Sequence, residues 1–100
     1  MHLARRVLDL WRVAAAERER LLGPTDETAS RPEVLERATL LLRMHAALRL
    51  LFPEDAELRA EWVRIRNRAL GGRRPLELMN AEGVDALRRC ADLLDAQAQQ

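Results

Sequence analysis

The stretch WVRIRNRALGGRRPLELMNAEG, residues 62–83, decides how this chain of 100 residues folds. Two adjacent glycines, Gly71 and Gly72, allow backbone conformations that other residues reach only with strain. Pro75 has its φ fixed at about −65°, which suits the first turn of a helix. Arg74, directly before it, is pushed toward extended backbone. The sequence therefore predicts an amphipathic helix that ends in a sharp turn at the glycines, and a short new helix that begins at Pro75.

The same stretch resembles the C-terminal, toxin-binding domain of the Xre/MbcA/ParS antitoxins. The likeness rests on the order and spacing of Trp62, Asn67, Leu70, Gly71, Gly72, Pro75, Leu76 and Gly83. With the helices before and after, it covers about residues 41–96. The alternative is a short-loop helical hairpin of an unrelated small protein, but such a hairpin does not need this particular string of residues.

The chain as a whole predicts an all-α fold, a small bundle of about five to six helices. Val, Ile and Thr are few and scattered, and apolar residues do not alternate with polar ones as they do in strands. We expect an N-terminal helical segment over residues 1–40, which resembles a degenerate helix-turn-helix. Residues 41–100 are expected to form the part that resembles the toxin-binding domain.

Residues 3–22 are compatible with one helix or with two. The alanines at 14–16 favour a continuous helix on propensity. The resemblance favours a break near residues 13–16, because relatives with an N-terminal helix-turn-helix have a turn there, and the break is our prediction. Gly23 and Pro24 then end the segment, and a loop should follow.

Residues 32–52 are predicted to form the central helix, because apolar side chains occupy most of its circumference. Ser30 and Glu33 have the spacing of a capping box at its start. The expected inner face contains Leu35, Ala38, Leu40, Leu41, Leu42, Met44, Ala47, Leu48, Leu51 and Phe52. His45 lies among them and is interpreted as a partly buried packing residue, since no second ligand lies one helical turn away.

Two more apolar stripes are expected after Pro53. They contain Leu58, Trp62 and Ile65 before the glycines and Leu76, Leu78, Met79, Val84, Leu87, Ala91 and Leu94 after them. The arginines beside the first stripe, Arg59, Arg64, Arg66 and Arg68, are expected to point largely outward. Asn80 is predicted to be the N-cap of the last helix, and the residues from Ala96 onward are expected to fray.

Composition narrows the functional classes. The net charge of +1 gives no electrostatic argument for nucleic acid. Cys90 is the single cysteine, so neither a disulfide within the chain nor a cysteine-based metal cluster is expected. No apolar run reaches membrane-spanning length, and a cytoplasmic location is the expectation. A catalytic Ser/His/Asp or Cys/His set and a phosphate-binding loop are both missing from the pattern, so we expect neither an enzyme nor a cofactor.

DNA binding is the alternative function, as a small helix-turn-helix transcriptional regulator that controls its own operon. Its weakness is the segment PTDETASRP, residues 24–32, where relatives have the recognition helix. The segment is bounded by prolines and carries two carboxylates, which would oppose the attraction to phosphates. A complex with several copies could still bind DNA by summing weak contacts.

The resemblance implies the antitoxin of a bacterial type II toxin–antitoxin pair, whose usual partner is a RES-domain toxin that consumes NAD⁺. Such an antitoxin does no chemistry; it occludes the entrance of the toxin's active site. We further expect a homo-oligomer, a dimer, inside a larger complex with the toxin. The side chains expected at the toxin are Arg73, Arg74, Arg88, Arg89, Asp92, Asp95, Gln97 and Gln99. The arginines offer paired donors to an acidic partner surface.

Overall fold

The computed structural model describes residues 2–22 and 31–99, and the elements in this part are all helical. The α-helices are α1 (His2–Leu10), α2 (Ala15–Leu22), α3 (Arg31–Leu51), α4 (Ala56–Glu61), α5 (Pro75–Glu82) and α6 (Val84–Ala98). Two 3₁₀-helices, η1 (Trp62–Arg64) and η2 (Arg68–Leu70), lie between α4 and α5. The predicted all-α fold is confirmed. The predicted loop after Leu22 and the cap at Ser30 fall outside the described residues.

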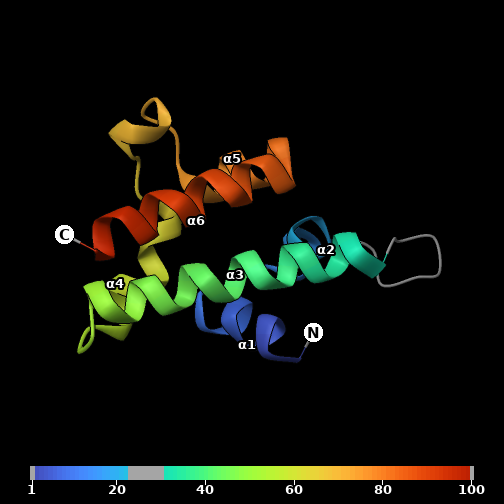
Figure 1. The fold of residues 1–100 in the computed structure, drawn as a ribbon, viewed down its shortest axis with the longest axis horizontal. Helices are drawn as coiled ribbons and strands as arrows, with labels where there is room; N and C mark the ends of the chain where they lie inside the picture. The colour runs from blue at the N-terminus through green and yellow to red at the C-terminus, as the bar shows by residue number, and fades with distance from the viewer. Residues whose placement is uncertain (1, 23–30, 100) are drawn as a thin grey trace.

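Helix α3 is the central element, with α6 along one side and α1 along the other (Figure 1). The buried side chains of these helices join in one core cluster, which α2, α5 and the residues around Trp62 complete. Most of the expected inner residues of α3 are buried, among them Leu41, Met44 and Leu48. The prediction that Leu35 belongs to the inner face is wrong, because its side chain is exposed. α3 has 21 residues and α1 only 9, so the side of α3 that faces α1 is left uncovered near Leu35 by the described residues.

The predicted break in the N-terminal segment is confirmed, and it lies at residues 11–14 between α1 and α2. Trp11 is buried there, and Arg12 has a φ of 57°, in the left-handed region that non-glycine residues rarely adopt. Arg64 donates from Nη1 to the Trp11 carbonyl at 2.6 Å and from Nη2 to the Arg12 carbonyl at 2.7 Å. The prediction that Arg64 points outward is therefore wrong, since its guanidinium closes this turn.

The helix before the glycines ends earlier than predicted. α4 stops at Glu61, the chain tightens into η1, and Ile65 is extended with φ −91° and ψ 134°. Tightening turns the side chains by a different angle per residue, so Trp62 and Val63 are buried while Ile65 is exposed. The prediction of Ile65 as an inner residue is wrong for this reason. Two β-branched residues in this short stretch, Val63 and Ile65, have lower helix propensity.

The last two helices meet at Gly83, which has φ 69° and ψ −136°. Asn80 lies inside α5, so its prediction as an N-cap is wrong; its Nδ2 donates to Glu17 Oε2 at 3.0 Å. The expected fraying from Ala96 is also wrong, because α6 continues to Ala98 and Ala98 packs against the core. The predicted stripe of α6 packs on α3 and is buried at Leu87, Ala91 and Leu94. Among the described residues no helix is long and apolar enough to cross a bilayer.

Cys90 belongs to the buried side of α6 and packs as a small apolar residue. Burial raises the pKa of its thiol to about 11, and the nearby positive charge of Arg89 opposes this rise only in part. A thiol in this state is not a nucleophile near neutral pH. Cys90 is therefore a core residue of α6.

Candidate functional site

The turn between η1 and α5 is built around Asn67, whose side chain and backbone both bond to residues 69–73. Its side-chain oxygen accepts from the Ala69 N–H at 3.0 Å, and its carbonyl accepts from the N–H groups of Leu70 at 3.0 Å and Gly72 at 2.9 Å. Its own N–H donates to the Arg73 carbonyl at 3.1 Å. We call residues 67–75 the glycine corner. Because these bonds all lie within a few residues, the corner is specified locally.

Both glycines of the corner have positive φ, 69° at Gly71 and 78° at Gly72. A Cβ atom at either position would meet no heavy atom within 4 Å. The glycines are therefore required by backbone conformation rather than by lack of space. Leu70 anchors the corner in the core, and Pro75, also buried, starts α5 where the sequence predicts.

The glycine corner projects from the body of the molecule beside α5 and α6 (Figure 1). Two of the expected toxin-binding arginines leave it toward α5. Arg73 Nη1 lies 2.9 Å from Glu82 Oε2, and Arg74 Nη1 lies 3.2 Å from Glu77 Oε1. The corner thus presents charged side chains that are already paired within the chain.

The outer face of α6 carries the other expected residues. Asp92 Oδ1 and Asp95 Oδ2 both approach Nη2 of Arg43 on α3, at 3.1 Å and 2.5 Å. These hydrogen bonds, that of Asp95 first, raise the pKa of the Arg43 guanidinium above its ordinary value. Arg43 is therefore a fixed positive charge that ties α6 to α3.

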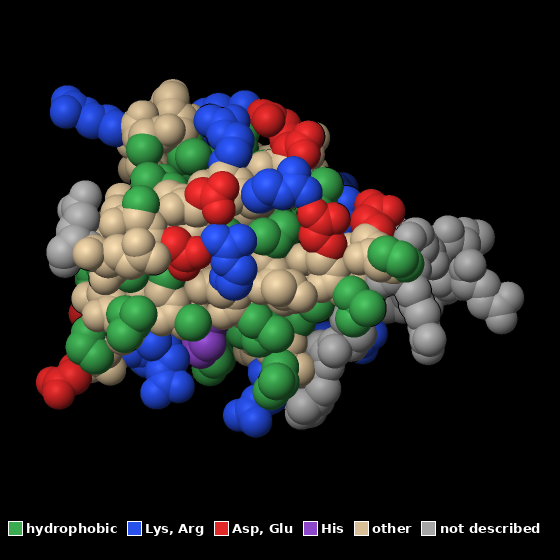
Figure 2. All heavy atoms as spheres, in the orientation of Figure 1, with side chains coloured by type: hydrophobic (Ala, Val, Ile, Leu, Met, Phe, Trp, Pro, Cys, Tyr) green, Lys and Arg blue, Asp and Glu red, His purple; other side chains and the backbone are tan. Residues whose placement is uncertain are grey.

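Arg88 makes a second connection of the same kind. It pairs with Glu36 on α3 and, at 3.2 Å from Nη1, with Asp85 on its own helix. Together Glu36, Arg43, Arg88, Asp92 and Asp95 form what we call the charged belt. Figure 2 shows the acidic and basic side chains side by side over the face that α3 and α6 make.

The end of α6 differs from the belt. Gln97 and Gln99 are exposed, and their side chains form no hydrogen bond with the described residues. Arg89 is only loosely paired, with 4.0 Å between its Nη1 and Glu82 Oε1. The structure thus brings the eight expected residues to the side of the molecule formed by the corner and α6, six of them in ion pairs within the chain.

Sequence reasoning missed the partners on α3, Glu36 and Arg43. They lie 52 residues from Arg88 and 49 residues from Asp92 along the chain, so no local pattern reveals the pairing. The charge of the α6 face was visible in the sequence, but its partners depend on how α6 packs on α3. The Arg43–Asp92 and Arg88–Glu36 pairs are solvent-exposed, while Arg43–Asp95 is half-buried. Exposed pairs contribute little to stability, so a partner protein can replace them at small cost.

Two other site classes have no support in the described residues. No three of their His, Cys, Asp or Glu side chains come together as a metal site. The segment on which the DNA-binding alternative depends lies mostly in residues 23–30, outside the described part.

An all-α bundle whose last helix packs on α3 and carries an outer face of paired charges is suited to binding another protein. Comparison with protein families gives this a specific identity: the model of the antitoxin Xre/MbcA/ParS C-terminal toxin-binding domain matches residues 47–99. The match spans more than half of the chain, and the chain belongs to this family of antitoxins. No curated protein and no solved structure matches it.

The matched region begins in the second half of α3 and includes the whole glycine corner and all of α6. The resemblance read from the sequence is therefore confirmed. Residues 47–99 belong to a family of toxin-binding domains, so the expected partner class is a toxin, with its type left unspecified.

Proposed function

We propose that this chain is a cytoplasmic bacterial antitoxin that binds a RES-domain, NAD⁺-consuming toxin and occludes the entrance of its active site. The observation that carries the proposal is the toxin-binding domain over residues 47–99, with its glycine corner and α6. The chain itself is inferred to do no chemistry. The RES toxin is the partner that the resemblance of the Trp62–Gly83 stretch implies.

The proposed contact surface is the outer face of α6 with its C-terminal end. The inner face of the helix is buried against α3, and the belt ties its outer face to the same helix. A surface that is already ordered loses little conformational entropy when it binds. The end of α6, with Gln97 and Gln99, is free to enter a cleft in the toxin.

Arg73, Arg74, Arg88 and Arg89 are the proposed donors to acidic groups of the toxin. Their ion pairs are solvent-exposed, and an arginine fork can turn from one carboxylate to another. Asp92 and Asp95 would act in the same way toward basic groups. We also propose that the complex with the RES-domain toxin contains a dimer of this chain.

Co-expression with the protein that the neighbouring open reading frame encodes, expected to be a RES-domain toxin, tests the proposal. We expect the toxin alone to stop growth and deplete cellular NAD⁺, and co-expression to restore both. An affinity tag on the toxin should retain this chain through gel filtration. If a folded chain neither co-purifies with the toxin nor restores growth, the proposal is wrong.

Variants separate the proposed surface from the rest of the molecule. The double variant Arg88→Glu, Arg89→Glu is expected to weaken toxin binding by about tenfold or more, because it places carboxylates opposite acidic groups. Gln97→Ala with Gln99→Ala tests the helix end without disturbing any ion pair. The matched control is Arg5→Glu with Arg20→Glu, two exposed arginines on α1 and α2. Equal weakening by this control would exclude α6 as the contact surface.

A further inference from the structure

The side of α3 that faces away from α6 carries a groove that the toxin-binding surface does not use. Two hollows, of about 280 Å³ and about 300 Å³, lie between α1, the second half of α3 and α4. Leu10 and His45 line both hollows, so the two are neighbours along one groove. We call it the α1–α3 groove. It is separated from α6 by the full width of α3 (Figure 1).

Two rows of side chains at helical spacing form the walls of one hollow. Leu3, Arg6 and Leu10 follow one another along α1, and Leu42, His45 and Arg49 repeat the same spacing along α3. Leu3 is 60% exposed and Leu10 is 55% exposed, although both are large and apolar. Both leucines line the same hollow, where the apolar side chains of a partner can cover them.

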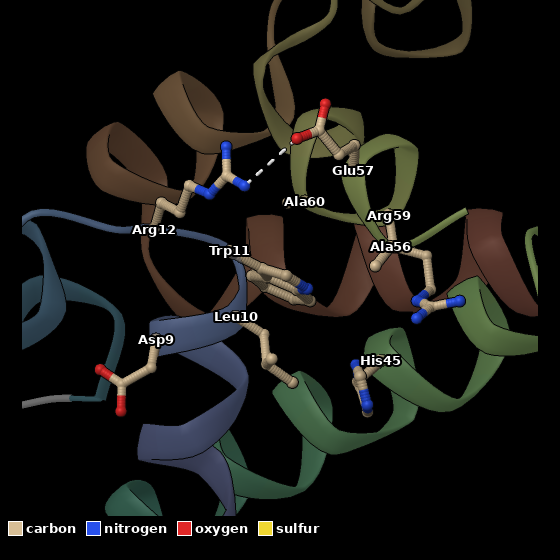
Figure 3. A pocket seen from close by; sticks show the side chains of 9 residues that line it. All are labelled: Asp9, Leu10, Trp11, Arg12, His45, Ala56, Glu57, Arg59 and Ala60. Atoms are coloured by element: carbon tan, nitrogen blue, oxygen red, sulfur yellow. Dashed lines mark ion pairs between the residues drawn. The ribbon is translucent and has the colours of Figure 1, made fainter. Parts of the chain in front are cut away.

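The other hollow is built around Trp11. Figure 3 shows its indole in the middle of the hollow, with the nitrogen-bearing end toward His45 and Arg59. Neither Trp11 Nε1 nor His45 Nδ1 has a hydrogen-bond partner among the described residues. A buried N–H without an acceptor is unfavourable. The described residues provide no acceptor for the indole N–H of Trp11 at the floor of the groove.

The charges of the groove are unbalanced in one direction. Its two acids are matched, since Asp9 pairs with Arg18 and Glu57 pairs with Arg12 at 3.5 Å. Arg6 and Arg49 make no ion pair among the described residues, and Arg59 donates only to the carbonyls of Phe52 and Pro53. The groove therefore presents positive charge that no carboxylate of the described chain neutralises.

We propose that the α1–α3 groove is a second docking surface, which takes an acidic, leucine-bearing helical segment of a partner protein. Leucine side chains of that segment would cover Leu3 and Leu10, and its carboxylates would face Arg6 and Arg49. A helix fits because the walls repeat with helical spacing, as in the helix-in-groove mode of recognition. The inference goes beyond toxin binding at α6, because the groove lies on the other side of α3.

A second copy of this chain is the poorer occupant. A two-fold symmetric contact puts the same surface on both sides, so the unpaired Arg6 and Arg49 of both copies would come together in one interface. Like charges that meet in this way oppose association. Charge complementarity thus favours an acidic partner over self-association.

The positive charges of Arg49 and Arg59 also act on the His45 imidazole. Burial lowers its pKa first, and the charges of Arg49 and Arg59 lower it further. An entering carboxylate would offset the two arginines. The His45 resonance is accordingly a sensor of an occupied groove.

The probe is a synthetic helical peptide of about 18 residues, long enough to form a helix on the surface. Leucines occupy one face at spacings of three and four, and glutamates flank them. Its counterpart has every glutamate replaced by glutamine. Binding to the full chain is followed by NMR at the indole N–H of Trp11, with the buried Trp62 as an internal reference.

We expect the glutamate peptide to shift the Trp11 and His45 signals in a saturable way and to leave Trp62 unchanged. Leu10→Ser and Arg49→Glu should each weaken binding by about tenfold. The matched controls Leu50→Ser and Arg68→Glu change an exposed leucine and an exposed arginine elsewhere and should have no effect. Higher salt should weaken binding, because the charges are at the surface.

Four results would overturn the proposal. They are the lack of any shift up to about 1 mM peptide, equal affinity for the glutamine peptide, equal weakening by the control variants, and self-association of the free chain that Leu10→Ser abolishes. The last would assign the groove to a second copy. Leu10→Ser, outside the matched residues 47–99, should leave toxin binding intact, so failure here is distinguishable from failure at α6.

Discussion

The chain changes direction at two corners, residues 11–14 and the glycine corner, and the two are held in different ways. The glycine corner is closed by Asn67 and by two glycines with positive φ, all within a few residues. The first corner contains no glycine, and Arg12 adopts the left-handed conformation itself. The carbonyls of Trp11 and Arg12 accept from Arg64, which lies 53 and 52 residues further along the chain, while the Val13 carbonyl accepts from the nearby Arg18 Nε at 2.9 Å.

The two corners therefore obtain their stability from different sources. The glycine corner carries its own hydrogen bonds and its own conformational freedom. The first corner depends on tertiary structure, since Trp11 must be buried and η1 must be in place before Arg64 can reach its acceptors. Substitutions that disturb packing should therefore destabilise the first corner more than the glycine corner.

The largest expected effect comes from the two tryptophans beside these corners. Trp11 is 1% exposed and Trp62 is 8% exposed. Replacing either by alanine should reduce the free energy of unfolding by about 3–5 kcal/mol, through lost burial and a cavity. Urea unfolding followed by circular dichroism measures this. Leu50→Ala, at a residue 73% exposed, is the control and should change it by less than about 0.5 kcal/mol. Losses below about 1 kcal/mol at both tryptophans would show that neither anchors the core.

Arg64→Met comes next and separates the corners directly. It leaves the carbonyls of Trp11 and Arg12 without their charged donor, and we expect a loss of about 1–3 kcal/mol. Hydrogen exchange should become faster in α1 and α2 but remain unchanged in the glycine corner. Arg66→Met is the matched control, because Arg66 makes only a 3.4 Å contact with the Gly72 carbonyl. Equal acceleration at both corners would contradict their independence.

Two substitutions with opposite expected effects compare the backbone conformations of the two corners. Gly72→Val should lower the free energy of unfolding by about 1 kcal/mol or more, because valine is strained at φ 78°. Arg12→Gly should raise it by up to about 1 kcal/mol, because glycine relieves the left-handed strain. The lost Arg12–Glu57 pair is exposed and matters little. Thermal unfolding of both variants beside the parent chain tests the signs, and two losses of equal size would contradict the idea.

The same contrast explains what could be read from the sequence. The glycine corner was predictable because Asn67, the two glycines and Pro75 are residue types that favour this backbone conformation locally. The family resemblance followed from that string. The break near Trp11 has no such signal, and only the likeness to relatives with a helix-turn-helix indicated it.

The errors have a common physical cause. Ile65 and Arg64 are predicted from a periodic pattern that continues through a helix, and Asn80 from its preference for the N-cap position. The shift to 3₁₀ geometry at Trp62 and the late break at Gly83 depend on tertiary packing, which overrides that period. The charged belt could be predicted only in half, since Arg43 and Glu36 approach α6 through the packing of two distant segments.

The smallest expected effect is a dependence of stability on pH through His45, below the first corner. Its pKa in the folded chain is lowered from 6.5, first by burial and then by Arg49 and Arg59. Arg6 from α1 lines the same groove and adds no acid. Between 6.5 and the lowered value, the unfolded chain binds more protons than the folded one. The free energy of unfolding should therefore fall as the pH decreases through this window.

His45→Gln separates this effect from the protonation of carboxylates at lower pH. Unfolding of the parent chain and of the variant should converge in slope above pH 6.5, where the imidazole is neutral in both states. In the window below, the parent should lose stability more steeply than the variant. A His2→Gln background leaves His45 as the single histidine for an NMR titration. Arg49→Gln should then raise the pKa of His45, because it removes the second cause of the shift. An unchanged His45 titration in Arg49→Gln would mean that the charge of Arg49 does not reach the imidazole, and that burial and Arg59 account for the lowered pKa.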